Sequence, residues 1–285
     1  MNKIGIYYGF WTKDWIVDFS KYVKKAESLG FDMIEFDMSV IMESPEKYQE
    51  RLKETLTKSE LDVSFCTSLA ENKDISSGYT NKRVKGIEYL KKSIKKVDEF
   101  GGEALSGILY GIWGDELKPG EDKSPYLQRS IKSMKEVAKT AEDYDVICNM
   151  EVVNRFEQFM LNTSSEAVDY VNEVDSSHVN ILLDTYHMNI EEDSFSKAIK
   201  TAGEQLGHFH IGANNRKLPG DGHLNWKKII GALNEINYDG NVVMEPFVLN
   251  GGDIAQDIKI WRNMDPDNKD QKAEEARKLI KGLLE

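Results

Sequence analysis

The sequence has few cysteines and no excess of basic residues. Its two cysteines among 285 residues, Cys66 and Cys148, form no CxxC pair, which excludes a disulfide scaffold and argues against a zinc site built on thiolates. Lys and Arg number 37 against 49 Asp and Glu, so the formal net charge is −12. Because nucleic-acid binding needs clustered basic side chains, we expect no nucleic-acid partner.

Long apolar runs are also missing. No segment approaches the roughly 18 consecutive apolar residues that a membrane helix needs, so we expect no membrane partner. The opening residues lead into a strand-like run without the apolar region of a signal peptide, and we expect a cytoplasmic protein. With 40% apolar and 30% charged residues, the composition is typical of a folded domain.

Short β-rich runs alternate with longer amphipathic segments such as 15–29 and 84–100. The alternation gives eight strand and helix units, followed by a charged helix over 265–285. This pattern predicts a single α/β domain over 1–285, a (β/α)8 TIM barrel with an extra C-terminal helix. An open doubly wound sheet shows the same alternation, but no GxGxxG or GxxxxGK[ST] loop follows the first strand. The expected strands are 4–8, 33–36, 61–65, 104–110, 146–152, 179–183, 206–211 and 241–244.

Four polar residues stand at the ends of the last four predicted strands, namely Glu151, Asp184, His210 and Glu245. They lie 33, 26 and 35 residues apart, about one unit each, so they should converge at the mouth of the barrel. Three carboxylates packed together repel one another unless a cation compensates them. Taken singly, each residue is an ordinary polar strand end. Together, three oxygen ligands and one imidazole indicate a site for manganese, magnesium or cobalt.

Further polar residues follow the same strand ends and should shape a substrate pocket. Glu157, His187 and Arg216 lie in these loops, and Arg216 supplies fixed donors for oxygens. His208 lies two residues before His210 on the same strand, so we expect a packed interior histidine or a partner of the site.

Three aromatic residues, Tyr7, Trp15 and Trp113, lie near the ends of predicted strands in the first half of the chain. Aromatic rings provide flat apolar surfaces against which a sugar packs. We predict that they form a wall of the pocket, with ordinary core packing as the alternative.

Five segments together resemble the ketose 3-epimerases, the family of D-tagatose and D-allulose (D-psicose) 3-epimerases among the xylose-isomerase-like barrels. The similarity spans nearly the whole chain, and the combination is far more specific than any one segment. The segments are MEVVNRFE at 150–157, LDTYHMNI at 183–190, GHFH at 207–210, NRKLPG at 215–220 and VMEPF at 243–247.

The resemblance implies that the four strand-end residues bind one divalent metal per subunit, manganese or cobalt, with magnesium as an alternative. Glu151 and Glu245 would then act on opposite faces of carbon 3 of an open-chain ketose, through a cis-enediolate. Glu157, His187 and Arg216 would hydrogen-bond the hydroxyls around carbons 1 to 3. The family resemblance also implies a homodimer or a homotetramer.

The first half of the chain departs from the family pattern. Asp37-Met38-Ser39-Val40 replaces an Ala-Ser-Pro-like stretch, and Cys66-Thr67-Ser68-Leu69 replaces a Gly-His-Gly-Pro-like turn. The reaction class is therefore better supported than the substrate, and ketohexoses, a ketopentose and a modified ketose all stay open.

Three other functions compete with epimerisation. An aldose–ketose isomerase of the same superfamily would move the proton between carbons 1 and 2. A non-catalytic sugar-binding protein would use the metal only structurally. An endonuclease of the superfamily fits poorly with five histidines and the charge of −12.

Overall fold

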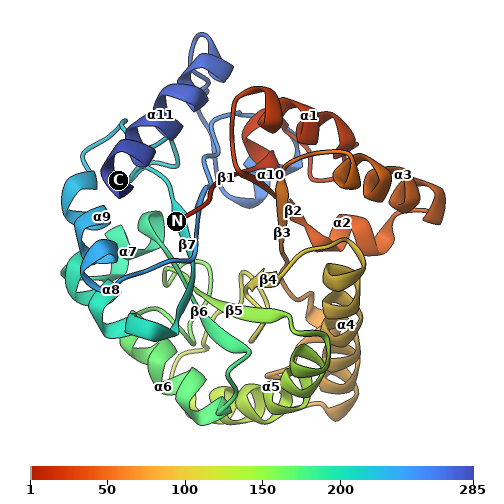
Figure 1. Ribbon diagram of the computed structural model, residues 1–285. Helices are drawn as coiled ribbons and strands as arrows, with labels where there is room; N and C mark the ends of the chain where they lie inside the picture. The colour runs from red at the N-terminus through yellow and green to blue at the C-terminus, as the bar shows by residue number, and fades with distance from the viewer. Residues whose placement is uncertain (1) are drawn as a thin grey trace.

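The computed structural model describes residues 2–285. Within this range eight parallel strands form a closed barrel in sequence order, and β1 pairs with both β2 and β8 (Figure 1). This confirms the predicted TIM barrel. The strands are β1 (Ile4–Tyr7), β2 (Met33–Asp37), β3 (Asp62–Cys66), β4 (Ala104–Gly107), β5 (Ile147–Val152), β6 (Val179–Asp184), β7 (Leu206–Ile211) and β8 (Asn241–Met244).

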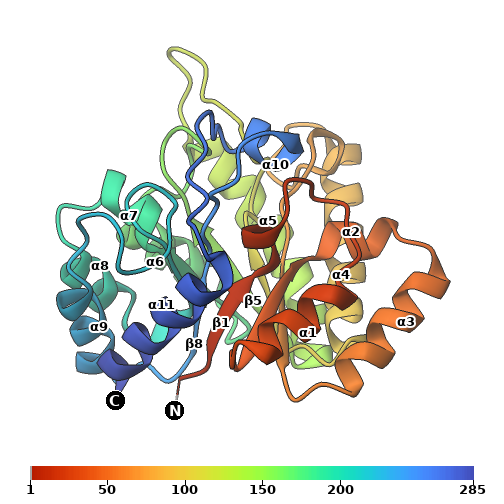
Figure 2. The ribbon, with the colours of Figure 1, turned by 90° about the horizontal axis from the view of Figure 1, so that it is seen from above.

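Long helices form the outer layer of the barrel, and the short helices α2, α7 and α10 lie near its mouth (Figure 1, Figure 2). None of the helices described for residues 2–285 is both long and apolar enough to span a membrane. The longer helices are α1 (Ser20–Ser28), α3 (Glu46–Thr57), α4 (Thr80–Glu99), α5 (Ser124–Tyr144), α6 (Ser164–Val174), α8 (Phe195–Ala202), α9 (Trp226–Glu235) and α11 (Lys269–Leu284). The short elements are α2 (Met38–Glu43), α7 (Thr185–Glu191), α10 (Gly252–Asp257) and the 3-10 turns η1 (Tyr8–Trp11), η2 (Glu71–Lys73) and η3 (Gly203–Gln205).

Helix α5 shows how the outer layer packs against the strands. Its buried positions include Ile131, Met134, Ala138 and Ala141, which recur at helical spacing and form one apolar face. The strands lie between the helices and the barrel interior and are buried on both sides, so most of their residues are apolar. This double burial explains why the strands were recognisable in the sequence.

Several predicted bounds were wrong by a few residues. The predicted strand 104–110 ends at Gly107, which has a φ of +117° and contacts the Thr67 backbone too closely for any side chain. The predicted helix 15–29 begins only at Ser20, because the preceding residues cross the mouth, where the backbone N–H of Trp15 donates to Asp253. The extra C-terminal helix begins at Lys269 rather than at 265.

Two of the short helices begin at an aspartate that ends a strand. The Asp37 Oδ1 atom accepts the backbone N–H of Ser39 at 2.8 Å and starts α2. The Asp184 Oδ1 atom accepts the backbone N–H of Tyr186 at 2.7 Å and starts α7. An N-terminal cap of this kind satisfies a helix donor while holding the aspartate at the end of its strand. Figure 2 shows α10 at the mouth, opposite the end of the barrel near the C-terminus.

The tight contact of Gly86 in α4 gives a stability prediction. A Cβ atom at Gly86 would lie 2.1 Å from the carbonyl oxygen of Lys73, whereas one at Gly231 in α9 would meet open space. We expect Gly86→Ala to lower the free energy of unfolding by about 1 to 3 kcal/mol, because the backbone must shift. The matched Gly231→Ala variant should raise it by about 0.5 to 1 kcal/mol. Urea denaturation measures both, and a stabilised Gly86→Ala variant would contradict the packing described here.

Candidate active site

The structure brings the four strand-end residues together at the mouth of the barrel. Glu151, Asp184, His210 and Glu245 each offer one ligand atom, and these atoms lie within 4.8 Å of one another. They come from β5, β6, β7 and the residue after β8, in this order around the barrel. We call these four side chains the ligand row, and the two glutamates stand at its ends. Asp184 and His210 are buried, and the side chains of Glu151 and Glu245 are 13% and 11% exposed.

The orientation of the His210 ring is fixed by a buried residue of the barrel interior that the sequence analysis missed. Glu35 on β2 is fully buried, and its Oε1 atom lies 2.7 Å from the Nε2 atom of His210, which donates to it. Its Oε2 atom accepts the hydroxyl of Ser64 at 2.8 Å and lies 3.1 Å from the Nε2 atom of His208. His208 is therefore buried beside this carboxylate, although within residues 2–285 neither ring nitrogen has a hydrogen-bond partner.

The other nitrogen of His210 faces the carboxylates. The Nδ1 atom lies 3.8 Å from the Oε1 atom of Glu245, and within residues 2–285 it is buried without a hydrogen-bond partner. An unsatisfied buried nitrogen beside three carboxylates is the donor set of a divalent cation site. The residues present therefore fit one such ion, with Glu35 behind the imidazole as the outer partner common in metal sites.

The same crowding perturbs the acids. Burial, followed by the charge of Glu245, raises the pKa of Glu151 well above its usual range. Burial raises the pKa of Glu245 to about 7. His210 shows the opposite balance: burial lowers its pKa, but the carboxylates of Glu35 and Glu245 raise it to about 10. Each shift reflects negative charge confined in a poorly solvated space.

Arg216 compensates part of this charge. Its NH1 group donates to the Oε2 atom of Glu245 at 2.9 Å and to the Oδ2 atom of Asp184 at 3.4 Å. Its NH2 group donates to the Oε1 atom of Glu157 at 3.3 Å, and the guanidinium lies 3.9 Å above the ring centroid of Tyr186. The backbone of Arg216 has a φ of +63°, which is strained for a residue with a side chain.

His187 lies beside Glu151, and its contacts fix the tautomer of its ring. Its Nδ1 atom accepts the backbone N–H of Asn154 at 3.1 Å, so the hydrogen of the neutral ring is on Nε2. The Nε2 atom lies 3.7 Å from the Oε1 atom of Glu151, and burial lowers the pKa of His187. Glu157 accepts the indole N–H of Trp113 at 3.0 Å and the side-chain amide of Asn154 at 3.1 Å.

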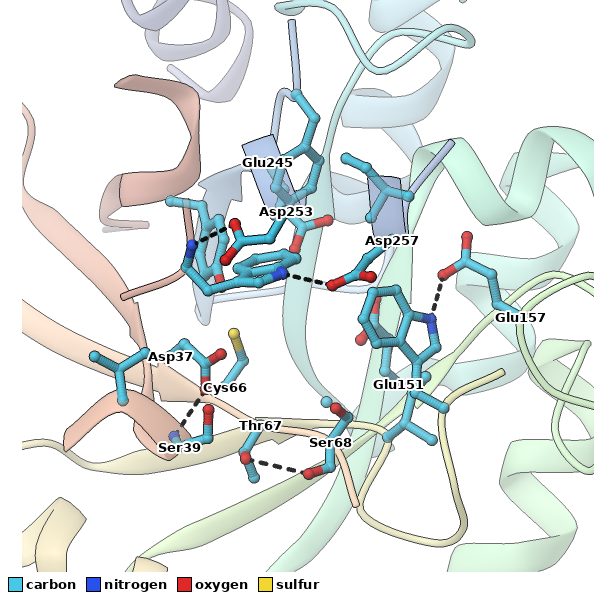
Figure 3. A pocket seen from close by; sticks show the side chains of 18 of the residues that line it. Asp37, Ser39, Cys66, Thr67, Ser68, Glu151, Glu157, Glu245, Asp253 and Asp257 are labelled. Carbon is cyan, nitrogen blue, oxygen red and sulfur yellow. Dashed lines mark hydrogen bonds between the residues drawn. The ribbon is translucent and has the colours of Figure 1, made fainter. Parts of the chain in front are cut away.

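Glu151, Glu157, His187, Arg216 and Glu245 line one pocket of about 550 Å³, shown in Figure 3, whereas Asp184 and His210 are not among its lining residues. All three predicted aromatic residues line it: Tyr7 is buried, and Trp15 and Trp113 are partly exposed and meet edge to face at 6.3 Å. The Trp15 indole N–H donates to Asp257 of α10 at 2.8 Å. The pocket lining also includes Phe247 and Asp253, to which the sequence analysis gave no role. Asp37, Ser39 and Cys66 line it as well, from the two segments that depart from the family pattern.

Comparison with known proteins identifies the family. Residues 23–281 match the sequence family described as xylose isomerase-like TIM barrel. The chain is 39% identical to a D-psicose 3-epimerase of Enterocloster bolteae, over 93% of this chain and 89% of that protein. The chain belongs to the ketose 3-epimerases. This ketose 3-epimerase is an isomerase that acts on carbohydrates, as its sequence predicts.

One further relative and one solved structure match the chain over almost its whole length. The D-psicose 3-epimerase of Ruminiclostridium cellulolyticum is 37% identical, over 99% of this chain and 98% of that protein. A crystal structure of D-psicose 3-epimerase with D-tagatose, from Clostridium cellulolyticum H10, has a TM-score of 0.95 at 36% identity and covers 99% of both chains. The overall fold of the chain is therefore that of these D-psicose 3-epimerases.

The buried position of Glu35 gives a second stability prediction. Glu35→Ala would leave the Nε2 atom of His210 and the hydroxyl of Ser64 without their acceptor. We expect it to lower the free energy of unfolding by about 3 to 5 kcal/mol. The matched Ser64→Ala variant removes one hydrogen bond and should cost about 1 kcal/mol. Denaturation at neutral pH compares the two, and equal small losses would show that Glu35 is not the anchor of His210.

Proposed function

We propose that this ketose 3-epimerase inverts carbon 3 of a free ketose in a metal-dependent reaction that passes through a cis-enediolate. The observation that carries the proposal is the row of four ligand atoms with a glutamate at each end. The names of the relatives, D-psicose 3-epimerase and ketose 3-epimerase, support the same carbon and the same substrate class.

Two carboxylates account for inversion. Glu151 on β5 and Glu245 after β8 border the pocket from opposite ends of the row, so a substrate between them presents one face of carbon 3 to each. One carboxylate removes the proton, and the other returns a proton from the opposite face. Burial raises the pKa of Glu245 to about 7, which suits proton exchange near neutral pH, because an effective acid or base titrates near the working pH.

Glu151, Asp184, His210 and Glu245 would hold one divalent ion, with manganese or cobalt favoured and magnesium as the alternative. Such an ion would polarise the ketose carbonyl and offset the charge of the enediolate. Glu35 keeps the Nδ1 atom of His210 turned toward the carboxylates. Arg216 spreads its charge over Glu245 and Asp184 while they are close together.

Glu157, His187 and Arg216 would orient the hydroxyls around carbons 1 to 3. The Nε2 hydrogen of His187 is a donor, and the carboxylate of Glu157 is an acceptor held in place by Trp113. Fixed donors and acceptors of this kind hold carbon 3 between the two glutamates. The rings of Tyr7, Trp15 and Trp113 would cover the apolar faces of the sugar.

The cytoplasmic location and the assembly into a homodimer or a homotetramer stay predictions from the sequence. The absence of a nucleic-acid partner also stays a prediction, supported by the net charge of −12.

Hydrogen exchange in deuterated water tests the reaction. Manganese-loaded protein is incubated with a panel of ketoses, and chromatography with NMR locates the incorporated deuterium. We expect label at carbon 3 together with the 3-epimer. Label at carbon 1 or 2 with formation of an aldose would identify an aldose–ketose isomerase instead. Absence of exchange on every ketose would favour a non-catalytic sugar-binding protein.

The two-carboxylate mechanism predicts the effect of removing either acid. Glu151→Gln and Glu245→Gln should each lower the rate of epimerisation by about 10²- to 10⁴-fold or more, because each removes one proton carrier. The fold should be retained, which circular dichroism checks. Glu88→Gln, on an exposed position of α4 and outside the pocket, is the control and should keep the normal rate. Near-normal turnover by either glutamine variant would rule the mechanism out.

Metal binding should release protons. Glu245, whose pKa burial raises to about 7, is protonated below that pH, and a cation binds only the ionised carboxylate. Manganese affinity should therefore rise by up to about tenfold per pH unit for each displaced proton between pH 6 and pH 7. Calorimetry in buffers of different ionisation enthalpy measures the affinity and the proton count. Equal affinities at pH 6 and pH 8, or activity that survives thorough EDTA treatment, would contradict the proposed site.

A further inference from the structure

A buried asparagine joins two of the side chains that line the pocket. Asn154 lies two residues after β5 and is 1% exposed. Its Nδ2 atom lies 2.8 Å from the Nδ1 atom of His187 on α7, and it donates to the Oε1 atom of Glu157 at 3.1 Å. One amide group therefore contacts both a histidine and a carboxylate of the candidate site.

The other end of this amide fixes its orientation. The Oδ1 atom of Asn154 accepts the backbone N–H of Phe156 at 2.9 Å, which is an Asx turn. Because the oxygen faces Phe156, the nitrogen faces His187 and Glu157, and an amide nitrogen only donates. The backbone N–H of Asn154 is a second donor to the Nδ1 atom of His187, at 3.1 Å. Two donors on Nδ1 keep the hydrogen of the neutral ring on Nε2.

Arg216 favours the opposite tautomer of His187. Its NH2 group lies 3.5 Å from the Nε2 atom, and a guanidinium only donates, so this contact is a hydrogen bond only if Nε2 carries no hydrogen. The two contacts from Asn154 are shorter and therefore stronger than this single one. The carboxylate oxygens of Glu151 and Asp184 lie 3.7 Å and 3.9 Å from Nε2, beyond hydrogen-bond distance, so neither takes up its hydrogen.

The next residue ties the same loop to α7. The backbone N–H of Arg155 donates to the Oε1 atom of Glu191 at 2.8 Å, and its guanidinium donates to both carboxylate oxygens at 2.9 Å and 2.7 Å. Glu191 ends α7, about one helical turn after His187. The loop after β5 is therefore held against α7 without the Asn154 side chain, and a substitution at this position changes the donors without releasing the loop.

We propose that Asn154 is a positioning residue that keeps the hydrogen of His187 on Nε2 and holds Glu157 beside it. This inference rests on the proposed function, in which both side chains bind hydroxyls of the ketose. The substrate then meets one donor, the Nε2 hydrogen, and one acceptor, the Glu157 carboxylate, in a fixed arrangement. In the other tautomer Nε2 would accept from Arg216, and the substrate would lose its donor.

Two variants separate this role from simple packing. Asn154→Asp keeps the shape and the bond to Phe156, but its second oxygen is an acceptor that draws hydrogen to Nδ1 of His187 and repels Glu157. Asn154→Ala removes the side chain and leaves the backbone N–H on Nδ1, so the tautomer stays. We expect kcat to fall about 100-fold or more in Asn154→Asp and about 10-fold or less in Asn154→Ala. A packing role predicts the reverse order, because alanine leaves a cavity.

The rates are measured on the manganese-loaded protein, with the ketose turned over best in the exchange panel. Nitrogen-15 NMR of labelled histidine, on the diamagnetic magnesium-loaded protein, shows directly which ring nitrogen carries the hydrogen. The experiment is done at pH 8, because burial lowers the pKa of His187 and the ring is therefore neutral. His187→Asn assigns the signal. The hydrogen should be on Nε2 in the wild type and in Asn154→Ala, and on Nδ1 in Asn154→Asp.

Asn172→Asp is the matched control, because it adds the same charge at an exposed position of α6 outside the pocket. It should keep the wild-type kcat and the wild-type His187 signal, and thermal denaturation checks that every variant folds. A wild-type hydrogen on Nδ1, or an Asn154→Asp variant that is faster than Asn154→Ala, would overturn the role of Asn154 and leave the epimerase intact. A wild type inactive on every ketose would instead refute the proposed function, while the NMR experiment still decides the tautomer.

Discussion

The pairing of one buried carboxylate with one imidazole supports the whole mouth of this barrel. Glu35 holds His210 from the inside, 175 residues away along the chain, and turns its free nitrogen toward three acids. A buried carboxylate is tolerated here because histidines and a hydroxyl surround it: burial favours its neutral form, but His210 and His208 hold the pKa of Glu35 well below its usual range. The Nδ1 atom of His210 is thereby held in place, and the three carboxylates of Glu151, Asp184 and Glu245 lie around it.

Negative charge is the second organising constraint. Four acids face the same space, and Arg216 contacts three of them, Glu157, Asp184 and Glu245. Its strained backbone and its contact with Tyr186 show how closely the surrounding loop fixes this cation. A site that concentrates carboxylates in this way is prepared for positive charge and for proton movement, which are the two requirements of the proposed reaction.

The sequence allowed the barrel and the ligand row to be predicted because both have a regular period. Most strand residues are apolar, and Glu151, Asp184, His210 and Glu245 recur about one unit apart. Glu35 was missed because it looks like a single polar residue within a buried strand. Its importance arises from His210 and Ser64 on other strands, and no local pattern encodes such contacts. The start of α1 was misplaced for the same reason, because Trp15 is held by α10 from the far end of the chain.

That last contact has a consequence for how the protein is made. Trp15 donates hydrogen bonds to Asp253 and Asp257, and β1 pairs with β8. Residues from the first and the last parts of the barrel therefore form one wall of the pocket together. During synthesis the N-terminal strand leaves the ribosome long before its partner exists, and its edge must wait for nearly the entire chain. A binding-competent pocket is therefore a property of the finished polypeptide, and a truncated product that stops before residue 241 has neither the closing strand nor this wall.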